Sequence, residues 1–274
     1  MKVDNKNTKE RNSARVVALI SSEIQHENTL ATLIENNINI VGVFQSNQKM
    51  GGIPIRYIYK NIKRRGILKT VSQIFARVLY LIFNYRIDKK LKKQIFPFYK
   101  IKKIISDSNI KISQVYEFKE ALNLIEELKP EILIVHTGAW IGKQVREIPG
   151  VKYVVGGHPG ITPLYRGSHS PFWTILNNDE VNIGWTTFIL DKGVDTGPVI
   201  EQGFISVNEV ESYMSLSWRG MVEIAKSQVN AVKRYELQGK IESKVHEIIP
   251  DGSEYPVPTF FKQIMYWLRQ SKVR

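Results

Sequence analysis

The sequence predicts an α/β protein: a doubly wound, mostly parallel sheet with a basic helical insertion and a small C-terminal extension of mixed, largely helical structure. Apolar segments of strand type alternate with segments of helical spacing, the pattern of parallel sheets covered by helices. The chain has 274 residues, enough to bury a full core, and 43% are hydrophobic. It has no cysteine, which excludes a disulfide scaffold, a cysteine-ligated zinc ion and a thiol nucleophile.

The first segments predict a strand, a helix and a second strand. Residues 15–21 (RVVALIS) and 38–45 (INIVGVFQ) are apolar, and residues 27–36 between them carry leucine and isoleucine on one helical face. Two strands joined in this way form a parallel unit with a right-handed crossover. Residues 1–14 are polar and charged, without the apolar region of a signal peptide, so we expect a disordered tail there.

Later segments extend the alternation. Strands are expected at residues 132–136 (ILIVH) and 152–155 (KYVV), and a helix over 117–129 is ended by Pro130. We expect the main domain to cover residues 15–203 and the C-terminal extension to cover 204–274. The extension is predicted to hold a long helix over 209–238, a hairpin, a turn at 255–258 and a short helix over 260–268. Its aromatic residues could form a homodimer surface or cover a sheet edge.

The net charge of +13 lies in one block. Residues 51–110 contain 15 Lys or Arg residues against only Asp88 and Asp107. Apolar spacing predicts an amphipathic helix over 66–87 and a second short helix over 100–106, so we treat the block as an insertion. It could face a polyanion, an anionic membrane or a phosphorylated substrate, or it could simply present its basic residues to water. The longest apolar run, 78–83, is far shorter than a membrane span, so any membrane contact is expected to be peripheral.

Two segments concentrate the chemistry: residues 156–167 (GGHPGITPLYRG) and 190–197 (LDKGVDTG). His158 follows a predicted strand, and the catalytic groups of open α/β sheets gather at the carboxyl ends of strands. A histidine there can act as acid or base near neutral pH, and a carboxylate such as Asp195 beside it would fix its tautomer and stabilise its protonated form. The alternative is a histidine that only caps a turn.

The motif His-Pro-Gly-x-x-Pro-x-Tyr-Arg-Gly at 158–167, followed by Asp-x-Gly-x-Asp-Thr-Gly at 191–197, resembles the folate-dependent formyltransferases. That family includes glycinamide ribonucleotide, methionyl-tRNA and sugar N-formyltransferases. The resemblance covers residues 15–203 without the basic insertion, and it implies a formyltransferase-like Rossmann variant as the catalytic domain. It also implies that a primary amine attacks the formyl carbon of 10-formyltetrahydrofolate. His158 would stabilise the oxyanion and move a proton, while Asp195 orients the ring.

The resemblance further implies which residues meet the two substrates. The pterin-binding segments correspond to Thr137, Gly138, Ala139, Trp140, Ile141, Ile189, Leu190, Asp191, Gly193 and Val194, and the cleft loop corresponds to Tyr165, Arg166 and Gly167. We also expect substrate contacts at His169, and at Ser21 and Ser22, where a phosphate could meet a helix N-terminus. No metal site is expected, because His26 and His246 have no partner at ligand spacing.

Two positions depart from the family pattern. Gly156 stands where the family has an asparagine, whose amide is the expected hydrogen-bond donor to the oxyanion. Loss of one such donor typically lowers the rate by about 10²–10³-fold. Phe188 stands where the family has a histidine. These two positions leave the implied fold and ligand class intact. The property that they put in doubt is turnover.

The leading hypothesis is the transfer of a formyl group to the primary amine of a nucleotide-linked amino sugar, by a cytoplasmic enzyme of polysaccharide biosynthesis. A methionyl-tRNA formyltransferase is the enzyme alternative, and its basic block would then contact phosphates. We rank tRNA lower because the charge lies in an insertion and not in a tail domain. A third hypothesis is a formyltransferase-like binding protein that no longer turns over, motivated by Gly156 and Phe188.

Overall fold

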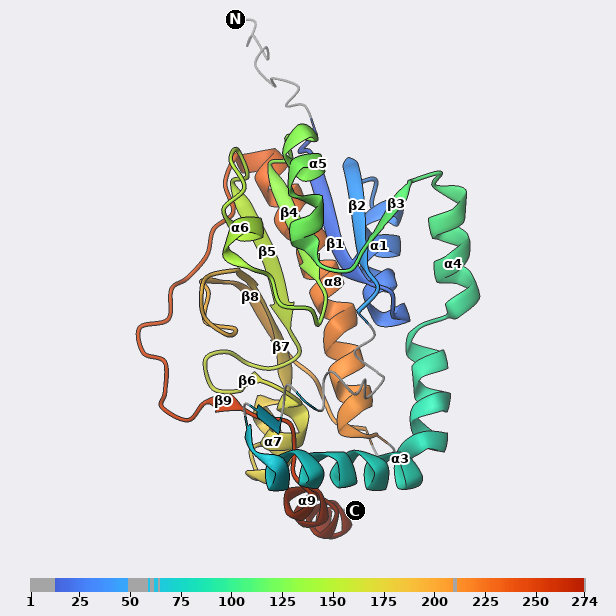
Figure 1. Cartoon of the computed structure of the whole chain (residues 1–274), viewed down its shortest axis with the longest axis vertical. Coiled ribbons are helices and arrows are strands. Elements are labelled where there is room, and N and C mark those ends of the chain that lie inside the picture. The colour runs from blue at the N-terminus through green and yellow to red at the C-terminus, as the bar shows by residue number, and fades with distance from the viewer. Residues whose placement is uncertain (1–12, 49–58, 60–61, 64, 209–210, 274) are drawn as a thin grey trace, which may run out of the picture.

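A seven-stranded sheet forms the centre of the molecule, in the order β3-β2-β1-β4-β5-β7-β8 (Figure 1). The computed structural model describes residues 13–48, 59, 62–63, 65–208 and 211–273. The strands are β1 (Val16–Ser21), β2 (Ile40–Ser46), β3 (Ile112–Val115), β4 (Ile132–His136), β5 (Tyr153–His158), β7 (Gly184–Ile189) and β8 (Val199–Phe204). The pairs among β1 to β5 are parallel, whereas β7 runs antiparallel to β5 and β8. The predicted doubly wound, mostly parallel sheet is therefore confirmed.

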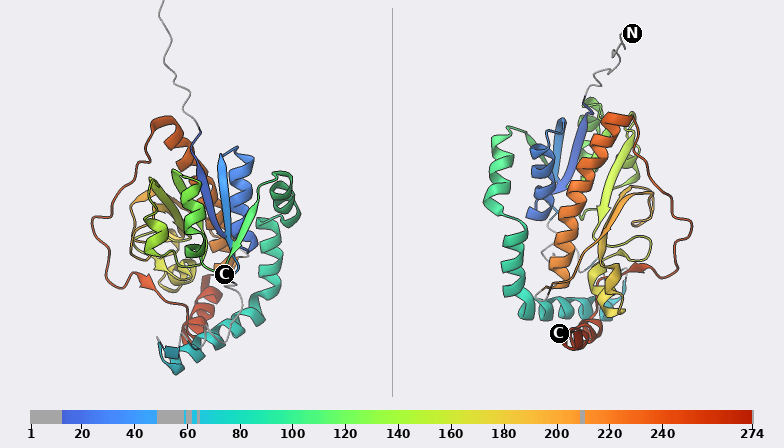
Figure 2. Two further views of the ribbon diagram at one scale, coloured as in Figure 1. Left: turned by 45° about the horizontal axis from the view of Figure 1, so that its top comes forward. Right: turned by 180° about the vertical axis from the view of Figure 1, so that it is seen from behind.

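Helices cover both faces of the sheet because successive strand residues point to opposite sides (Figure 2). In β1, Ala18 and Ile20 join a buried cluster with α1 (Ile24–Glu35) and α8 (Tyr213–Gln238). Val17 and Leu19 join a second cluster with α5 (Leu122–Glu127) and α6 (Lys143–Arg146). Both faces are fully buried, which explains why β1 and β4 read as continuous apolar runs instead of alternating ones.

Several elements differ from the sequence-based expectation. β3, α6 and α7 (Ser170–Leu176) were not predicted, and they have only 4, 4 and 7 residues. β5 continues to His158, so this histidine is the last residue of the strand and does not follow it. The pairing partner β7 extends the strand, since His158 lies opposite Thr186 in the antiparallel register.

The basic block supplies α3 (Ile67–Ile95) and α4 (Phe98–Asp107), which lie between β2 and β3 along the chain. The predicted helices are present, although α3 is longer than expected, with 29 residues. Both helices contribute to the core, because Tyr80 of α3 and Ile101 of α4 are almost fully buried, as is Phe96 between them. By length and composition alone, α3 is the one helix among the described residues that could cross a membrane. Part of the block, residues 51–58, lies outside the described residues, as does most of the expected tail at 1–14.

The C-terminal segment folds back on the site end of the molecule. The predicted hairpin is wrong: Lys244 bridges to Val199, and β9 (Glu254–Tyr255) pairs in parallel with β6 (Arg166–Gly167). The last helix, α9 (Phe260–Val273), packs on α3 and α7. Its Tyr266 is buried, and Tyr255 stacks on Tyr165, so these two aromatic rings of the tail pack within the chain.

Candidate active site

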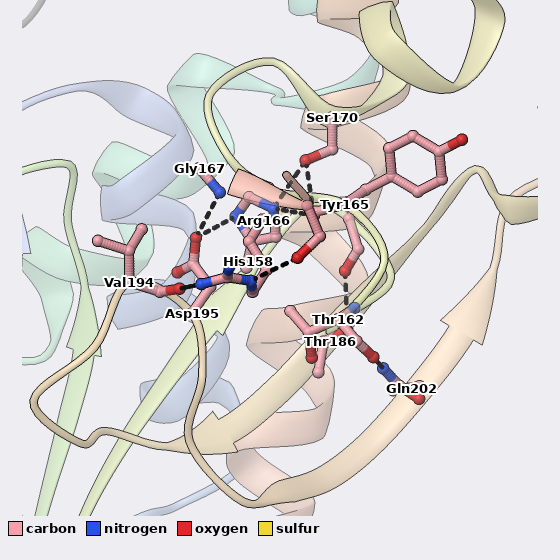
Figure 3. Close-up of polar contacts among 12 residues, drawn as sticks. His158, Thr162, Tyr165, Arg166, Gly167, Ser170, Thr186, Val194, Asp195 and Gln202 are labelled. Carbon is pink, nitrogen blue, oxygen red and sulfur yellow. Dashed lines mark hydrogen bonds and ion pairs between the residues drawn. The ribbon is translucent and has the colours of Figure 1, made fainter. Parts of the chain in front are cut away.

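His158 and Asp195 meet at the carboxyl end of β5, as Figure 3 shows. The Nδ1 atom of His158 lies 3.4 Å from Oδ2 of Asp195. The Nε2 atom lies 2.9 Å from the carbonyl oxygen of Tyr165 and 2.7 Å from Oγ of Ser170. The ring is 5% exposed, and both of its nitrogens contact oxygen atoms of the protein. The carboxylate fixes the ring and stabilises the positive charge that appears when the imidazole takes up a proton.

The loop that carries Asp195 is held by a network of local hydrogen bonds. Asp195 has a left-handed backbone conformation, with φ of 52°, and its Oδ2 atom accepts the amide N–H of Gly167 at 2.9 Å. The carboxylate of Asp191 accepts the amide N–H of Gly193 and the hydroxyl of Thr196. A carboxylate bonded to the amide two residues later is an Asx turn, which stabilises tight loops. Asp191, predicted to lie at the cofactor, therefore also shapes the loop that orients Asp195.

Leu190 fills the space beside Gly156. A Cβ atom built on Gly156 would lie 2.0 Å from Cδ1 of Leu190 and 3.6 Å from the ring of Phe188. Gly156 and His158 share one face of β5, because side chains alternate along a strand. The position at which the resemblance implies an asparagine is therefore part of an apolar cluster of Gly156, Leu190 and Phe188 beside His158. In the described part of the chain, no side-chain amide takes the place of the missing donor within this motif.

The two segments predicted to bind the pterin come at the ends of β4 and β7, the strands on either side of β5. Thr137 follows β4, and its Oγ1 accepts the amide N–H of Ala139 and contacts Oγ of Ser21 at the end of β1. Trp140 is 67% exposed, whereas Ile141 is buried. The second segment is attached to β5, because the amide N–H of Leu190 donates to the carbonyl oxygen of Val154. An exposed indole beside buried apolar side chains fits the face of a flat heteroaromatic ring, so Trp140 and Ile141 suit a pterin.

The predicted substrate contacts are distributed unevenly. Ser22 is exposed just before α1, while Ser21 is buried against Thr137. The Tyr165 side chain points away from His158 and donates its hydroxyl to Asp179, and burial raises the pKa of this phenol. Arg166 is also inside, bonded to the carbonyl of Val194 and to Ser253. The observed roles of Tyr165 and Arg166 are thus to hold the loop, and substrate contact by any of these residues stays a prediction.

His169 is the N-cap residue of α7 and has a left-handed conformation, with its ring against Tyr213. Burial and the nearby Arg77 lower the pKa of His169 to about 4. The imidazole is therefore neutral at pH 7 and would meet a phosphate as a hydrogen-bond donor and not as a cation.

The structure adds residues that the sequence analysis missed. Ser170 contacts Nε2 of His158, and Ser253 holds Arg166 from the C-terminal segment. Thr186 and Gln202 hold the loop of residues 160–162 from β7 and β8 (Figure 3). Ser170 lies three residues after the recognised motif and could have been suspected, whereas Ser253 lies 87 residues from Arg166 and carries no local signal.

A buried polar group lies below the site, between β4 and α1. The ring of His136 bonds to the hydroxyl of Thr29 and lies edge-on to the ring of His26. Burial, and secondarily His26, lowers the pKa of His136 to about 3. His136 is therefore a neutral core residue at pH 7, as expected of a histidine at the end of a buried strand.

Comparison with known proteins identifies relatives of this chain. A family model described as formyl transferase matches residues 82–231, more than half of the chain. The methionyl-tRNA formyltransferase of Desulforamulus reducens is 38% identical over 105 residues, covering 38% of this chain and 31% of that protein. The methionyl-tRNA formyltransferase of Thermodesulfovibrio yellowstonii is 34% identical over 122 residues, covering 43% and 38%. The chain thus spans well under half the length of these curated relatives.

Solved structures resemble the chain over a greater length. A sugar N-formyltransferase from Shewanella superposes with a TM-score of 0.53 at 12% sequence identity, covering 94% of this chain and 88% of that one. At this level of identity the likeness shows the fold, and it agrees with the sheet order and helix layers seen here.

Proposed function

Because the chain belongs to the formyl transferase family, we propose that it transfers a formyl group from 10-formyltetrahydrofolate to the primary amine of a nucleotide-linked amino sugar in the cytoplasm. The amine nitrogen forms a bond to the formyl carbon, and the bond from that carbon to the folate nitrogen breaks. The proton that leaves the amine ends on the released tetrahydrofolate nitrogen. The His158–Asp195 pair is the observation that carries the proposal.

The pair supplies the proton chemistry of the transfer. A histidine positioned at the reacting atoms contributes about 10²–10⁴-fold as general acid–base catalyst. Asp195 is fixed by the Gly167 amide, so it holds the ring while the charge changes. The Nε2 atom must exchange one of its oxygen partners, Tyr165 or Ser170, when a reacting group approaches. Of the two, the Ser170 hydroxyl is the mobile partner, because it can rotate about its side-chain bond.

One feature supports an acceptor that carries phosphate, such as a nucleotide-linked amino sugar, whereas the Shewanella likeness, at 12% identity, bears on the fold alone. Ser22 and the start of α1 lie at the carboxyl end of β1, where a diphosphate would meet free amide groups. A methionyl-tRNA acceptor remains the competing proposal, and it is motivated by the curated relatives.

A second candidate function is favoured by one observation: Leu190 occupies the position of the missing amide donor. A chain with this apolar cluster could bind the folate without transferring the formyl group. Such a protein would keep the pterin segments and the His158–Asp195 pair while turnover falls by about 10²–10³-fold.

A mass-spectrometric transfer assay tests these proposals. Purified protein is incubated with 10-formyltetrahydrofolate and a panel of nucleotide-linked amino sugars, and in parallel with Met-tRNA. Formylation of one sugar supports the amino-sugar proposal, whereas formylation of Met-tRNA alone overturns it. Donor binding by calorimetry without any product supports the binding-protein candidate. The matched control is His158→Ala, which must lose product in any successful assay.

A further inference from the structure

The outward side of α3 is apolar along its first four turns. The exposed side chains recur every three or four residues, which places them on one helical face: Leu68, Val71, Phe75, Val78 and Ile82. Phe75 and Ile82 expose 60% and 69% of their surface. A soluble protein rarely leaves so many large apolar side chains together in water without a partner.

Helix α9 enlarges this surface. It packs against α3, as Figure 2 shows, and the ring of Trp267 contacts the ring of Phe83 with 5.0 Å between the ring centroids. On the outward side of α9, Phe261 and Met265 are exposed one turn apart. We call the exposed apolar residues of α3 and α9 together the outer face.

The remaining length of α3 continues the same stripe with cations. Arg86, Lys89 and Lys93 follow Ile82 at the same spacing and are exposed. Between residues 59 and 106 the sequence has one acidic residue, Asp88, and residues 260–274 have none. Asp88 faces inward, because its carboxylate accepts the hydroxyls of Tyr80 and Ser212. The outer face is therefore bordered by positive charge, and within residues 59–106 of the sequence the one acidic residue, Asp88, is turned away from it.

We propose that the outer face docks on the surface of an anionic lipid bilayer. Apolar side chains would enter the boundary between headgroups and acyl chains, and the cations would meet lipid phosphates. Nucleic acid would engage the cations but leave Leu68 to Ile82 facing water. A second copy of this chain would cover the apolar side chains but bring the same unbalanced positive charge against itself. A lipid surface matches both parts of the face.

The inner side of α3 is packed into the protein, so the proposal places the helix on the bilayer surface and not across it. Gln73 donates to the carbonyl of Val257, and Asp88 joins Tyr80 to the start of α8. Tyr80 is buried in one cluster with Phe172 and Tyr266. Passage of α3 through a membrane would break all of these contacts, whereas docking of its outer face leaves them intact.

The outer face and the candidate active site share one end of the molecule. Ser170, which contacts His158, begins α7, and Phe172 of α7 stacks on Tyr266 of α9. In Figure 1 the first half of α3 runs across the end toward which β1 leads. Docking would therefore hold the site near the lipid surface, whether or not the protein transfers a formyl group.

Vesicle flotation tests the proposal with the full-length chain. Neutral phosphatidylcholine vesicles are compared with vesicles that also contain phosphatidylglycerol. We expect co-flotation with the anionic vesicles, and loss of at least tenfold in Phe75→Glu/Ile82→Glu, which places two carboxylates in the interface. The matched control is Val181→Glu/Leu237→Glu, which alters two apolar residues that are more exposed than Phe75 and Ile82 but lie outside the outer face, and it should bind as the unmodified chain does. Replacement of Arg86, Lys89 and Lys93 by glutamine should lower binding about fivefold per cation.

Circular dichroism and thermal unfolding establish that each variant is folded, since the substituted residues are exposed. Equal binding to neutral and anionic vesicles overturns the charge part of the proposal. Absence of vesicle binding overturns it entirely. A dimer by light scattering that Phe75→Glu/Ile82→Glu dissociates would then assign the face to a second copy. Retention of tRNA that only the glutamine variant loses would assign it to a nucleic acid.

Discussion

Cδ1 of Leu190 lies 2.0 Å from the position that a Cβ atom on Gly156 would occupy. The glycine and the leucine therefore form a matched pair, in which the larger side chain fills the space left by the smaller one. This relationship links the sequence departure at Gly156 to the packing beside His158. It also means that an amide donor cannot be introduced at this point by one substitution without moving Leu190.

The first prediction concerns that pair. Gly156→Asn alone should lower stability by about 1 kcal/mol, because the partly exposed Leu190 side chain must move to make room for it. Gly156→Asn/Leu190→Ala should relieve the clash and raise the formyl-transfer rate, by up to about 10²–10³-fold over Leu190→Ala alone. Urea unfolding and the transfer assay measure the two effects. Equal stability of Gly156→Asn and the unmodified chain contradicts the packing argument.

The second prediction concerns the positioning role of Ser170. Ser170→Ala removes a partner of Nε2 of His158 and leaves the Tyr165 carbonyl in place. We expect kcat to fall by about fivefold, which corresponds to the free energy of one hydrogen bond, about 1 kcal/mol, while the affinity for the formyl donor stays unchanged. Ser170→Thr, which keeps the hydroxyl, serves as the control. It should have the same kcat and the same pH profile of kcat as the unmodified chain. A change in donor affinity with kcat constant would show that Ser170 acts on binding instead.

The third prediction concerns stability at low pH. The folded-state pKa of His136 is lowered to about 3, below its ordinary value of 6.5, so the unfolded chain binds the proton more readily. Stability from this group is complete above pH 6.5 and falls as the pH drops toward 3, with a limiting slope of about 1.4 kcal/mol per pH unit. His169, with its pKa lowered to about 4, adds to the slope in the same direction.

Urea unfolding at pH 7, 6 and 5 measures this slope. His136→Asn keeps a polar group beside Thr29 but cannot take up a proton, so its stability should fall less steeply between pH 6 and pH 5. The matched control is His246→Asn, at a histidine that is less buried and should leave a steeper slope than His136→Asn does. Identical slopes for His136→Asn and the unmodified chain would contradict the assignment.

The fourth prediction concerns the attachment of α3 to α8. Burial raises the pKa of Asp88, and its carboxylate accepts the hydroxyls of Tyr80 and Ser212 at 2.7 and 2.6 Å. Asp88→Ala leaves both hydroxyls without this acceptor and should lower stability by about 2–3 kcal/mol. Asp88→Asn keeps one acceptor oxygen and should cost less. Faster cleavage of α3 by limited proteolysis in Asp88→Ala would show that α3 has loosened from α8. Unchanged cleavage would contradict the role of Asp88 in holding the two helices together.

The sequence was sufficient to predict the central sheet because its strands are short apolar runs separated by helical spacing. β1, β2 and β4 lie where residues 15–21, 38–45 and 132–136 predicted them. β3 could not be predicted, since ISQV has only two apolar residues and its pairing with β2 supplies the rest of its stability. The same limit explains the wrong hairpin, because β9 pairs with β6, far away in the chain.

The site was predictable to a similar extent. His158 and Asp195 were recognised from their motifs, and the structure places them in contact. The role of Leu190 could not be derived from the sequence, since nothing local shows that its side chain points at Gly156. Ser253 was equally hidden, because it reaches Arg166 only after α8 and the following segment have folded back.

The most direct test of the account is a single-turnover transfer assay with formyl-labelled 10-formyltetrahydrofolate and the acceptor panel, comparing the unmodified chain with Asp195→Asn. Asparagine preserves the shape and one acceptor oxygen for the Gly167 amide, but not the charge beside His158. The account predicts labelled product from the unmodified chain and a rate lower by about 10²–10⁴-fold in Asp195→Asn, with donor affinity retained. Equal rates from the two proteins would contradict the assignment of His158 and Asp195 as the catalytic pair.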